Sequence, residues 1–166
     1  MNSAAIHRIR AADMTDIAGI VALEQGVAEA PHWPMAEYAA IVDSSGDPSG
    51  TIRRCLLVAE TADHMLGFAV GKVIMTRENA LAELESVAVD IKARRSGVGR
   101  ALCEAVVNWC TQQGANVVEL EVRAGSTPAI ALYRGLGFLD IGRRPDYYRD
   151  PVEDAFLMRL NLDQEK

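Results

Sequence analysis

The sequence is poor in the features that mark several common classes of protein. None of its apolar runs approaches the ~20 residues that a membrane-spanning helix requires. No secretory signal is recognisable in its opening residues, so we expect a cytoplasmic protein without membrane association. Lysine and arginine number 17 against 23 acidic residues, and the net charge of −6 argues against a general nucleic-acid binder.

Patterns typical of metal sites and disulfides are also missing. The three cysteines, Cys55, Cys103 and Cys110, form no Cys-x-x-Cys pair, and their number is odd. We interpret them as small buried residues of a protein in a reducing compartment. The three histidines are far apart and lack ligand spacing, so we expect no metal site.

What the chain does contain is enough apolar material for one core. With 166 residues, 49% of them hydrophobic and 24% charged, residues 1–166 fit a single globular domain. Period-2 and helical patterns alternate along it and predict an α/β fold, a mixed sheet with helices on both faces. Strands are expected at 6–9, 55–60, 65–74, 80–89, 117–122, 138–141 and 155–160. Helices are expected after an N-cap at Asp13, from 33–34, from 98 to Gly114, and from an N-cap at Thr127 to near Gly137.

One basic, glycine-containing stretch joins a predicted strand to a predicted helix. Its residues are Ala93, Arg94, Arg95, Ser96, Gly97, Val98, Gly99, Arg100 and Ala101. A helix N-terminus leaves backbone N–H groups unpaired and its dipole favours an anion, while glycine lets the backbone approach a bulky ligand. The stretch therefore predicts a site for a ligand that carries phosphate.

Two common nucleotide motifs do not fit this stretch. The P-loop ends in Gly-Lys-Ser/Thr, which the chain lacks. The dinucleotide motif needs a third glycine where this chain has Leu102. A lone Gly-x-Gly also fits a plain strand-to-helix turn, so the stretch by itself leaves the ligand open.

Two motifs together carry a resemblance to a known superfamily. Arg94-x-x-Gly97-x-Gly99 resembles the acetyl-CoA pyrophosphate loop of the GNAT acetyltransferases. Downstream, residues 132–138 resemble the Leu-Tyr-x-x-x-Gly-Phe segment that closes the site in the same superfamily. Residues 120–124, 129–133, 143–148 and 153–155 look most like ribosomal-protein-alanine N-acetyltransferases of the RimI type. The close resemblance spans roughly residues 84–160.

The resemblance implies the GNAT fold, with a mostly antiparallel sheet and a cofactor loop between a central strand and the following helix. It also implies acetyl-CoA as the cofactor. Backbone groups at the end of that strand would pair with the pantetheine arm, and Ser126 stands where RimI-like proteins usually carry an asparagine. The implied cofactor-binding residues are Val87, Ala88, Val89, Arg94, Arg95, Ser96, Gly97, Val98, Gly99, Arg100 and Ser126.

Two glutamates are candidates for the general base. A strand over 117–122 places Glu119 and Glu121 on one face, and a carboxylate within a sheet is costly unless it is used or paired. By resemblance Glu121 matches the family's base, and Glu85 on the neighbouring strand is the second candidate. The alternative for each is an exposed strand glutamate or an ion pair with Arg123; the two could also act together through a water.

Aromatic residues complete the implied site. Tyr133 is the acid by resemblance, since a phenol with a pKa near ~10 stays protonated at pH 7; the alternative is a core aromatic. Trp33 is a candidate wall of the acceptor site, although a core anchor is the preferred interpretation. Tyr147 and Tyr148 are expected in the last loop before the final strand, where one of them lines the acceptor mouth. The loop at 44–50 is longer than the RimI type has, which leaves the acceptor open.

These residues predict an N-acetyltransferase that transfers directly from acetyl-CoA to an amine. An α-amine titrates near ~8 and a lysine side chain near ~10.4, so an N-terminal acceptor needs the least help at pH 7. We therefore expect a protein N-terminus as the acceptor, with a ribosomal protein as one candidate. The alternative acceptors are a small amine, an antibiotic or a lysine side chain. An alternative of another class is a non-catalytic acyl-CoA-sensing module.

Overall fold

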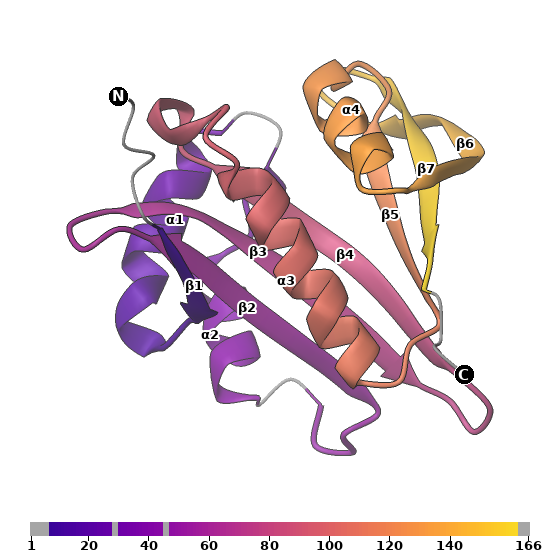
Figure 1. Ribbon diagram of the computed structural model, residues 1–166, viewed down its shortest axis with the longest axis horizontal. Coiled ribbons are helices and arrows are strands. Elements are labelled where there is room, and N and C mark those ends of the chain that lie inside the picture. Colours follow the sequence, from indigo (N-terminus) through magenta and orange to yellow (C-terminus); the bar gives the residue numbers. More distant parts are fainter. Residues whose placement is uncertain (1–6, 28–29, 45–46, 163–166) are drawn as a thin grey trace.

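The computed structural model describes residues 7–27, 30–44 and 47–162, and its elements form one mixed sheet with helices on both faces (Figure 1). The strand order is β1-β2-β3-β4-β5-β7-β6. This confirms the predicted fold class. The elements are β1 (Arg8–Ala11), η1 (Met14–Asp16), α1 (Ile17–Gln25), α2 (Met35–Asp43), β2 (Ile52–Glu60), β3 (Met65–Met75), β4 (Ala80–Val89), η2 (Ile91–Ala93), α3 (Val98–Gln112), β5 (Val117–Arg123), α4 (Thr127–Gly135), β6 (Leu139–Tyr148) and β7 (Glu153–Asn161).

The predicted order of elements is confirmed, while several boundaries were wrong. β1 begins at Arg8 rather than at residue 6, which lies outside the described residues. The N-cap of α4 is Ser126, so Thr127 is its first helical residue. β6 continues to Tyr148 instead of ending at 141. It is a solvent-exposed edge strand paired with β7, so polar residues occupy both its faces and hide the strand pattern.

Two apolar clusters lie on opposite faces of the sheet. The cluster under α3 includes Val73, Ala82, Leu102, Cys103, Val106 and Cys110. The cluster under α1 and α2 includes Ile20, Tyr38, Val58, Phe68, Val70 and Ala88. Each buried aliphatic side chain contributes roughly 1.5–3 kcal/mol, so these helices are held by their apolar faces. Burial raises the pKa of the Cys103 and Cys110 thiols to about 12, as expected of inert core residues.

β4 and β5 are parallel neighbours that separate soon after they meet. Their pairing comprises Ala82 with Val118 and Glu83 with Glu119 in the described part of the chain. Beyond that point β5 diverges from β4 and carries α4, β6 and β7 with it, which opens a V in the sheet (Figure 1). The remainder of β4, from Leu84 to Val89, therefore turns an edge toward this V.

A β-bulge reverses the faces of β4 just beyond this pairing. Val70 pairs with Ser86 whereas Gly71 pairs with Leu84, so Glu85 is an extra residue in β4. Before the bulge the even-numbered residues of β4 pack in the cluster under α3, and after it the odd-numbered residues do. As a result the last two valines of β4 face α3 and its N-terminal loop.

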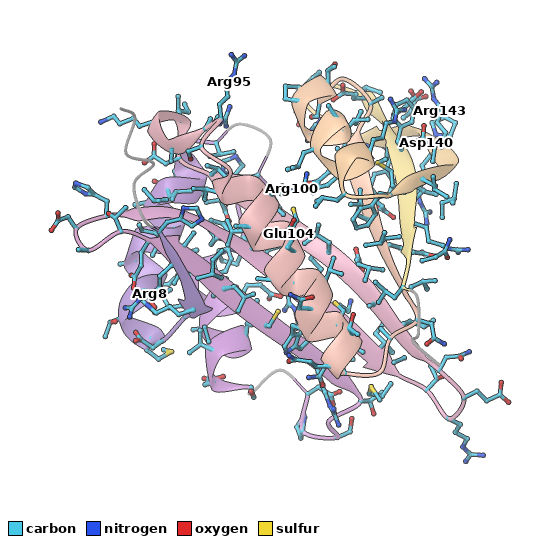
Figure 2. The ribbon with its side chains drawn as sticks, in the orientation of Figure 1. Arg8, Arg95, Arg100, Glu104, Asp140 and Arg143 are labelled. Atoms are coloured by element: carbon cyan, nitrogen blue, oxygen red, sulfur yellow. The ribbon has the colours of Figure 1, made fainter. Side chains whose placement is uncertain are left out.

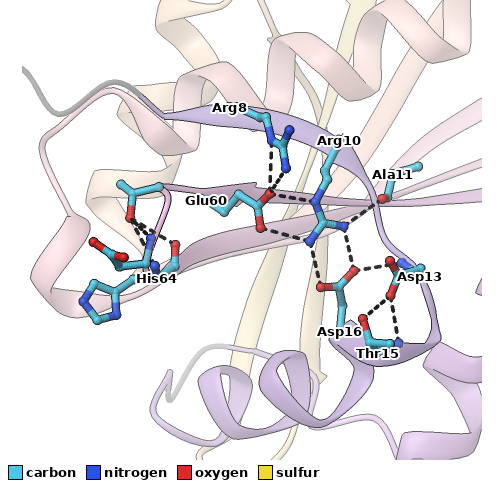
Figure 3. Close-up of polar contacts among 10 residues, drawn as sticks. Arg8, Arg10, Ala11, Asp13, Thr15, Asp16, Glu60 and His64 are labelled. Carbon is cyan, nitrogen blue, oxygen red and sulfur yellow. Dashed lines mark hydrogen bonds and ion pairs between the residues drawn. The ribbon is translucent and has the colours of Figure 1, made fainter.

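An ion-pair network fastens β1 to the rest of the fold (Figure 3). Arg10 donates to both carboxylate oxygens of Asp16 at 2.8 and 2.9 Å, and also to Glu60 at 2.8 and 2.9 Å. Arg8 bonds the same Glu60 carboxylate. Asp13 forms a capping box with Asp16 at the start of η1, as the predicted N-cap at this position requires. One guanidinium thus joins β1, β2 and the first helical turn.

Candidate active site

The predicted anion-binding stretch lies at the N-terminus of α3, after the short helix η2 that the sequence did not predict. Arg95 and Gly97 both have left-handed backbone, with φ of 62° and 85°, and Gly97 is the N-cap of α3. Successive turns of this kind make the N–H groups of Gly97, Val98 and Gly99 available to one bound anion. The backbone geometry fits a phosphate-bearing cofactor such as acetyl-CoA.

The side chains of this loop are spread rather than gathered. Arg95 projects outward from the loop, and Arg100 pairs with Glu104 at 2.9 Å (Figure 2). The Nε atom of Arg94 lies 3.5 Å from the carbonyl oxygen of Val89. The Ser96 hydroxyl donates to the Ala93 carbonyl. In this loop the backbone amides, rather than the side chains, are thus placed together at one point, and the arginines add positive charge around them.

Three elements converge beside this loop. A Cβ built on Gly99 would lie 3.4 Å from Leu132 of α4 and 3.6 Å from Val89 of β4. The end of β4, the start of α3 and α4 are thus packed together. Gly67 of β3 pairs with Val89 in the sheet, and a Cβ on it would stand 2.6 Å from the carbonyl oxygen of Ala88. The predicted cofactor strand, Val87 to Val89, therefore has a glycine beside it on β3, at a position where a Cβ would collide with its backbone.

Tyr133 and Ser126 both belong to α4. Tyr133 is partly buried against the α3 cluster, and its ring meets Phe138 edge-on at 5.9 Å. Burial raises the pKa of Tyr133 well above its usual value, and nearby Cys103 and Tyr148 add to the shift. Its phenol is protonated at neutral pH. Ser126 is the N-cap residue of α4 but makes no side-chain cap, which leaves its hydroxyl available at this end.

A cavity of about 210 Å³ opens where β4 and β5 part. It lies on the sheet face opposite α3, since Lys72, Ile74 and Glu83 alternate with residues that pack under that helix. The cavity is lined by Lys72, Ile74, Leu81, Ala82, Glu83, Glu119, Leu120, Glu121, Arg144 and Leu157. Three carboxylates and two cations thus surround a space large enough for a small polar group.

Glu121 is the carboxylate of this cavity that several polar groups approach. The Nε atom of Arg144 lies 3.3 Å from its Oε1 atom. Tyr147 hydrogen-bonds to it, which raises the pKa of Tyr147. The predicted alternative, an ion pair between Glu121 and Arg123, is wrong, because Arg123 pairs with Glu153 at 3.4 Å. The Glu121 side chain is 26% exposed and hence accessible from the cavity.

Tyr147 and Tyr148 stand together at the end of β6 rather than in a loop. Their rings meet edge-on at 5.1 Å, and Tyr147 is exposed. Arg123 stacks over Tyr148 at 4.3 Å. Burial raises the pKa of Tyr148 to about 12, and the negative charge of Glu121 adds to this. Both rings thus lie near Glu121, on the side of the V formed by β5, β6 and β7.

Glu85 and Trp33 lie in a different environment. Arg54 donates to Glu85 at 2.9 Å and to Glu37 of α2 at 2.7 Å. The same guanidinium lies over the Trp33 ring at 5.2 Å, and that ring packs 5.6 Å from Tyr38. This placement favours the core-anchor interpretation of Trp33. Glu85 lies outside the cavity lining, and its ion pair of 2.9 Å is closer than the 3.3 Å pair of Glu121 with Arg144, which makes Glu85 the weaker candidate for the base.

Three charged residues that line the cavity were not predicted as site residues: Lys72, Glu83 and Arg144. Burial raises the pKa of Glu83, with further effects of Glu85, Lys72, Glu121 and Glu119, of which Lys72 alone lowers it. The period-2 pattern of β4 could have placed Glu83 on this face. Arg144 lies in the 143–148 segment that resembles the RimI type, but its strand was predicted to end at 141, so the sequence assigned its side chain to no face of the sheet. Within residues 7–27, 30–44 and 47–162, no group of His, Cys, Asp or Glu side chains could hold a metal ion.

Comparison with known proteins identifies the family. The model described as "Acetyltransferase (GNAT) family" matches residues 15–138. The chain belongs to this family. The [ribosomal protein bS18]-alanine N-acetyltransferase of Escherichia coli is 40% identical to this GNAT protein over 100 residues, 59% of this chain and 65% of that enzyme. An uncharacterized Mycobacterium leprae protein, ML0378, is 35% identical over 127 residues, 76% of this chain and 33% of its own length.

The fold of this GNAT protein is shared with a solved member. The crystal structure of the ribosomal-protein-S18-alanine N-acetyltransferase from Escherichia coli aligns with a TM-score of 0.75 and 28% identity over 97% of each chain. By contrast, the GNAT chain spans 65% and 33% of the length of the two curated relatives named above. No helix among its described residues is long and apolar enough to cross a membrane.

Proposed function

We propose that the protein is an acetyl-CoA-dependent N-acetyltransferase that acts on the N-terminal α-amine of a protein. The observation that carries this proposal is the position of Glu121. Its carboxylate lines the cavity at the parting of β4 and β5, and Arg144 and Tyr147 approach it. A carboxylate held at the edge of a small cavity suits the removal of a proton from an amine.

The proposed roles follow from placement. Backbone amides of the Arg94–Arg100 loop would hold the pyrophosphate, and the free edge of Val87–Val89 would pair with the pantetheine arm. Acetyl-CoA supplies the activated acetyl group when bound. Glu121 accepts a proton from the amine as its nitrogen attacks. Tyr133, neutral because burial raises its pKa, donates its phenolic proton to the sulfur as the carbon–sulfur bond breaks.

An N-terminal acceptor is supported by the relatives. The Escherichia coli relative is named for the alanine of ribosomal protein bS18. An α-amine with a pKa near ~8 is partly neutral at pH 7, so a single carboxylate suffices as its base. We extend this acceptor class to the present chain, with an intracellular, cytoplasmic setting as part of the same proposal.

A small cationic amine is the second candidate acceptor. Glu83, Glu119 and Glu121 give the cavity three carboxylates, which would attract a polyamine or an aminoglycoside. Lys72 and Arg144 offset part of that charge, and Glu119 is already bonded to Arg159 at 2.5 Å. The balance favours an acceptor that brings one ammonium group to Glu121.

The test measures CoA release from acetyl-CoA with a panel of acceptors. The panel contains short peptides beginning with Ala, Ser, Met or Gly, a peptide with an internal lysine, spermidine and an aminoglycoside. We expect turnover on peptides that begin with Ala or Ser, and loss of turnover in Tyr133→Phe. Turnover on small amines alone would mean that the acceptor is a small amine and not a protein N-terminus. Tight acetyl-CoA binding without turnover on any acceptor would indicate a non-catalytic acyl-CoA-sensing module instead of an enzyme.

A further inference from the structure

The pairing of β6 with β7 is irregular between Arg144 and Tyr148, close to the proposed acceptor cavity. Arg144 pairs with Ala155 and Tyr148 pairs with Glu153. Residues 145–147 of β6 therefore lie opposite a single residue of β7, Asp154. Bulges of this kind re-aim side chains near functional sites. Here Arg144, which precedes the bulge, and Tyr147, its last residue, both contact Glu121.

The bulge cannot be held by ordinary strand pairing. Pro145 has no N–H group to donate. Asp146 has a φ of 51°, a left-handed backbone that a non-glycine residue adopts at a cost. The Asp154 side chain takes over the missing pairing, because its Oδ1 atom accepts the N–H of Asp146 at 2.8 Å. A side-chain carboxylate thus replaces a backbone carbonyl at this point of the hairpin.

The same carboxylate also separates two consecutive arginines. The other oxygen of Asp154 accepts from Arg143, whose guanidinium stacks over Phe156 at 5.4 Å. Arg143 is thereby kept on one side of the hairpin while Arg144 turns to the cavity. Both hydrogen bonds hold the pKa of Asp154 below its usual value, the bond from the Asp146 amide most strongly. The carboxylate is therefore ionised at neutral pH and able to accept both.

We propose that Asp154 is a positioning residue for the acceptor side of the site: it holds the 145–147 bulge so that Arg144 and Tyr147 both reach Glu121. The proposal rests on the proposed function of Glu121. Asp154 itself lies outside the cavity lining. Its effect passes through the bulge to the two side chains that surround the base, and so to the binding of the acceptor rather than of acetyl-CoA.

The test compares three variants. Asp154→Ala removes the acceptor of the Asp146 amide, Asp154→Asn retains an oxygen for it, and Arg143→Gln removes the other partner alone. We expect Asp154→Ala to raise the KM of the acceptor peptide about tenfold, the scale of one lost hydrogen bond, with kcat and the KM of acetyl-CoA changed far less. Asp154→Asn and Arg143→Gln should stay within about twofold of the parent.

A second readout does not depend on turnover. NMR of tyrosine-labelled protein, assigned with Tyr147→Phe, follows the pKa of Tyr147, which its bond to Glu121 raises in the parent. In Asp154→Ala this pKa should fall toward ~10 while that of Tyr133 is unchanged, and the Asp146 amide should exchange faster. If the parent turns over no acceptor, the proposed function fails, and this readout still decides the role of Asp154.

Two sets of results would overturn the proposal. In the first, Asp154→Ala leaves the acceptor KM and the Tyr147 pKa at their parent values. In the second, Asp154→Asn or Arg143→Gln reproduces the full defect of Asp154→Ala, which would assign the effect to charge pairing instead of the bulge.

Discussion

Glu119 and Glu121 stand two positions apart on β5, yet their surroundings differ. Glu119 faces its register partner Arg159 on β7, and the two are bonded at 2.5 and 3.0 Å. Glu121 is met from β6, by Arg144 at 3.3 Å and by the Tyr147 hydroxyl. Both line the cavity, but Glu119 is paired with the strand beside it through one oxygen, whereas Glu121 is approached by two side chains of β6.

This difference predicts different effects of the same substitution. Glu121→Gln should lower kcat about 10²–10⁴-fold, because a neutral amide cannot accept the proton of the amine. The matched control, Glu119→Gln, should stay within about threefold of the parent, since it loses an exposed ion pair of small value. Initial rates at saturating acetyl-CoA measure both. Equal losses in the two variants would mean that Glu121 acts only through the charge of the cavity.

At this scale, the sequence predicts residues that belong to local motifs. Gly97 and Gly99 were predicted because a strand, a turn and a helix N-terminus follow each other along the chain. Glu83 and Arg144 were missed, because their roles depend on a cavity between strands that are far apart in sequence. Proximity across a sheet comes from register, and register is set by partners that a local pattern does not contain.

The β3–β4 pair illustrates how one element supports another. Gly67 lies beside the end of β4, and its missing side chain lets the Ala88 carbonyl approach to a distance of 2.6 Å from an ideal Cβ position. A backbone atom cannot move aside as a flexible side chain would. The free edge of Val87–Val89 therefore depends on the absence of one methyl group on the neighbouring strand.

Gly67→Ala should lower the free energy of unfolding by about 1–3 kcal/mol, the usual cost of overpacking. It should also weaken acetyl-CoA binding, because the end of β4 must shift. Gly135→Ala is the control: nothing lies within 4 Å of its Cβ position in α4, and alanine favours a helix by about 0.5–1 kcal/mol. Urea unfolding and calorimetric binding test both variants. A Gly67→Ala protein as stable as the parent would contradict the packing argument.

Whole elements were predicted well where their apolar pattern was regular. β4, rich in apolar residues and bounded by polar ones, was predicted at its observed bounds, Ala80–Val89. The bulge at Glu85 escaped prediction, because an extra residue is defined only against the strand opposite. β6 was cut short for a related reason: the residues Gly142, Arg143, Arg144, Pro145 and Asp146 have the composition of a loop. Pairing with β7 and the side chain of Asp154 make them a strand.

At the scale of the whole molecule, ion pairs join β1 to β2 and to the first helical turn. Arg10 and Arg8 lower the pKa of Glu60 to about 2, and Arg10 also lowers that of Asp16. A carboxylate with a lowered folded-state pKa stabilises the fold above its unfolded pKa, near 4.5 for Glu60. This stabilisation is lost as the pH falls from there through about 2.

We therefore expect Arg10→Gln to unfold at a higher pH than the parent in an acid titration followed by circular dichroism. Arg8→Gln is the control, because Arg8 is largely exposed and bonds Glu60 alone, whereas Arg10 serves two carboxylates. The pH midpoint of acid unfolding should therefore move less in Arg8→Gln than in Arg10→Gln. Coincident acid transitions of Arg10→Gln and the parent would show that this network does not govern acid stability.

The V between β4 and β5 also lies between the two proposed binding sites. The cavity around Glu121 opens on the sheet face opposite α3, while the Arg94–Arg100 loop belongs to the α3 face. If the protein acts as proposed, acetyl-CoA would bind from the α3 face and the acceptor amine from the opposite face, and the two would meet at the gap in the sheet. CoA and the acetylated acceptor would then dissociate from opposite faces, so the release of one would not depend on the release of the other.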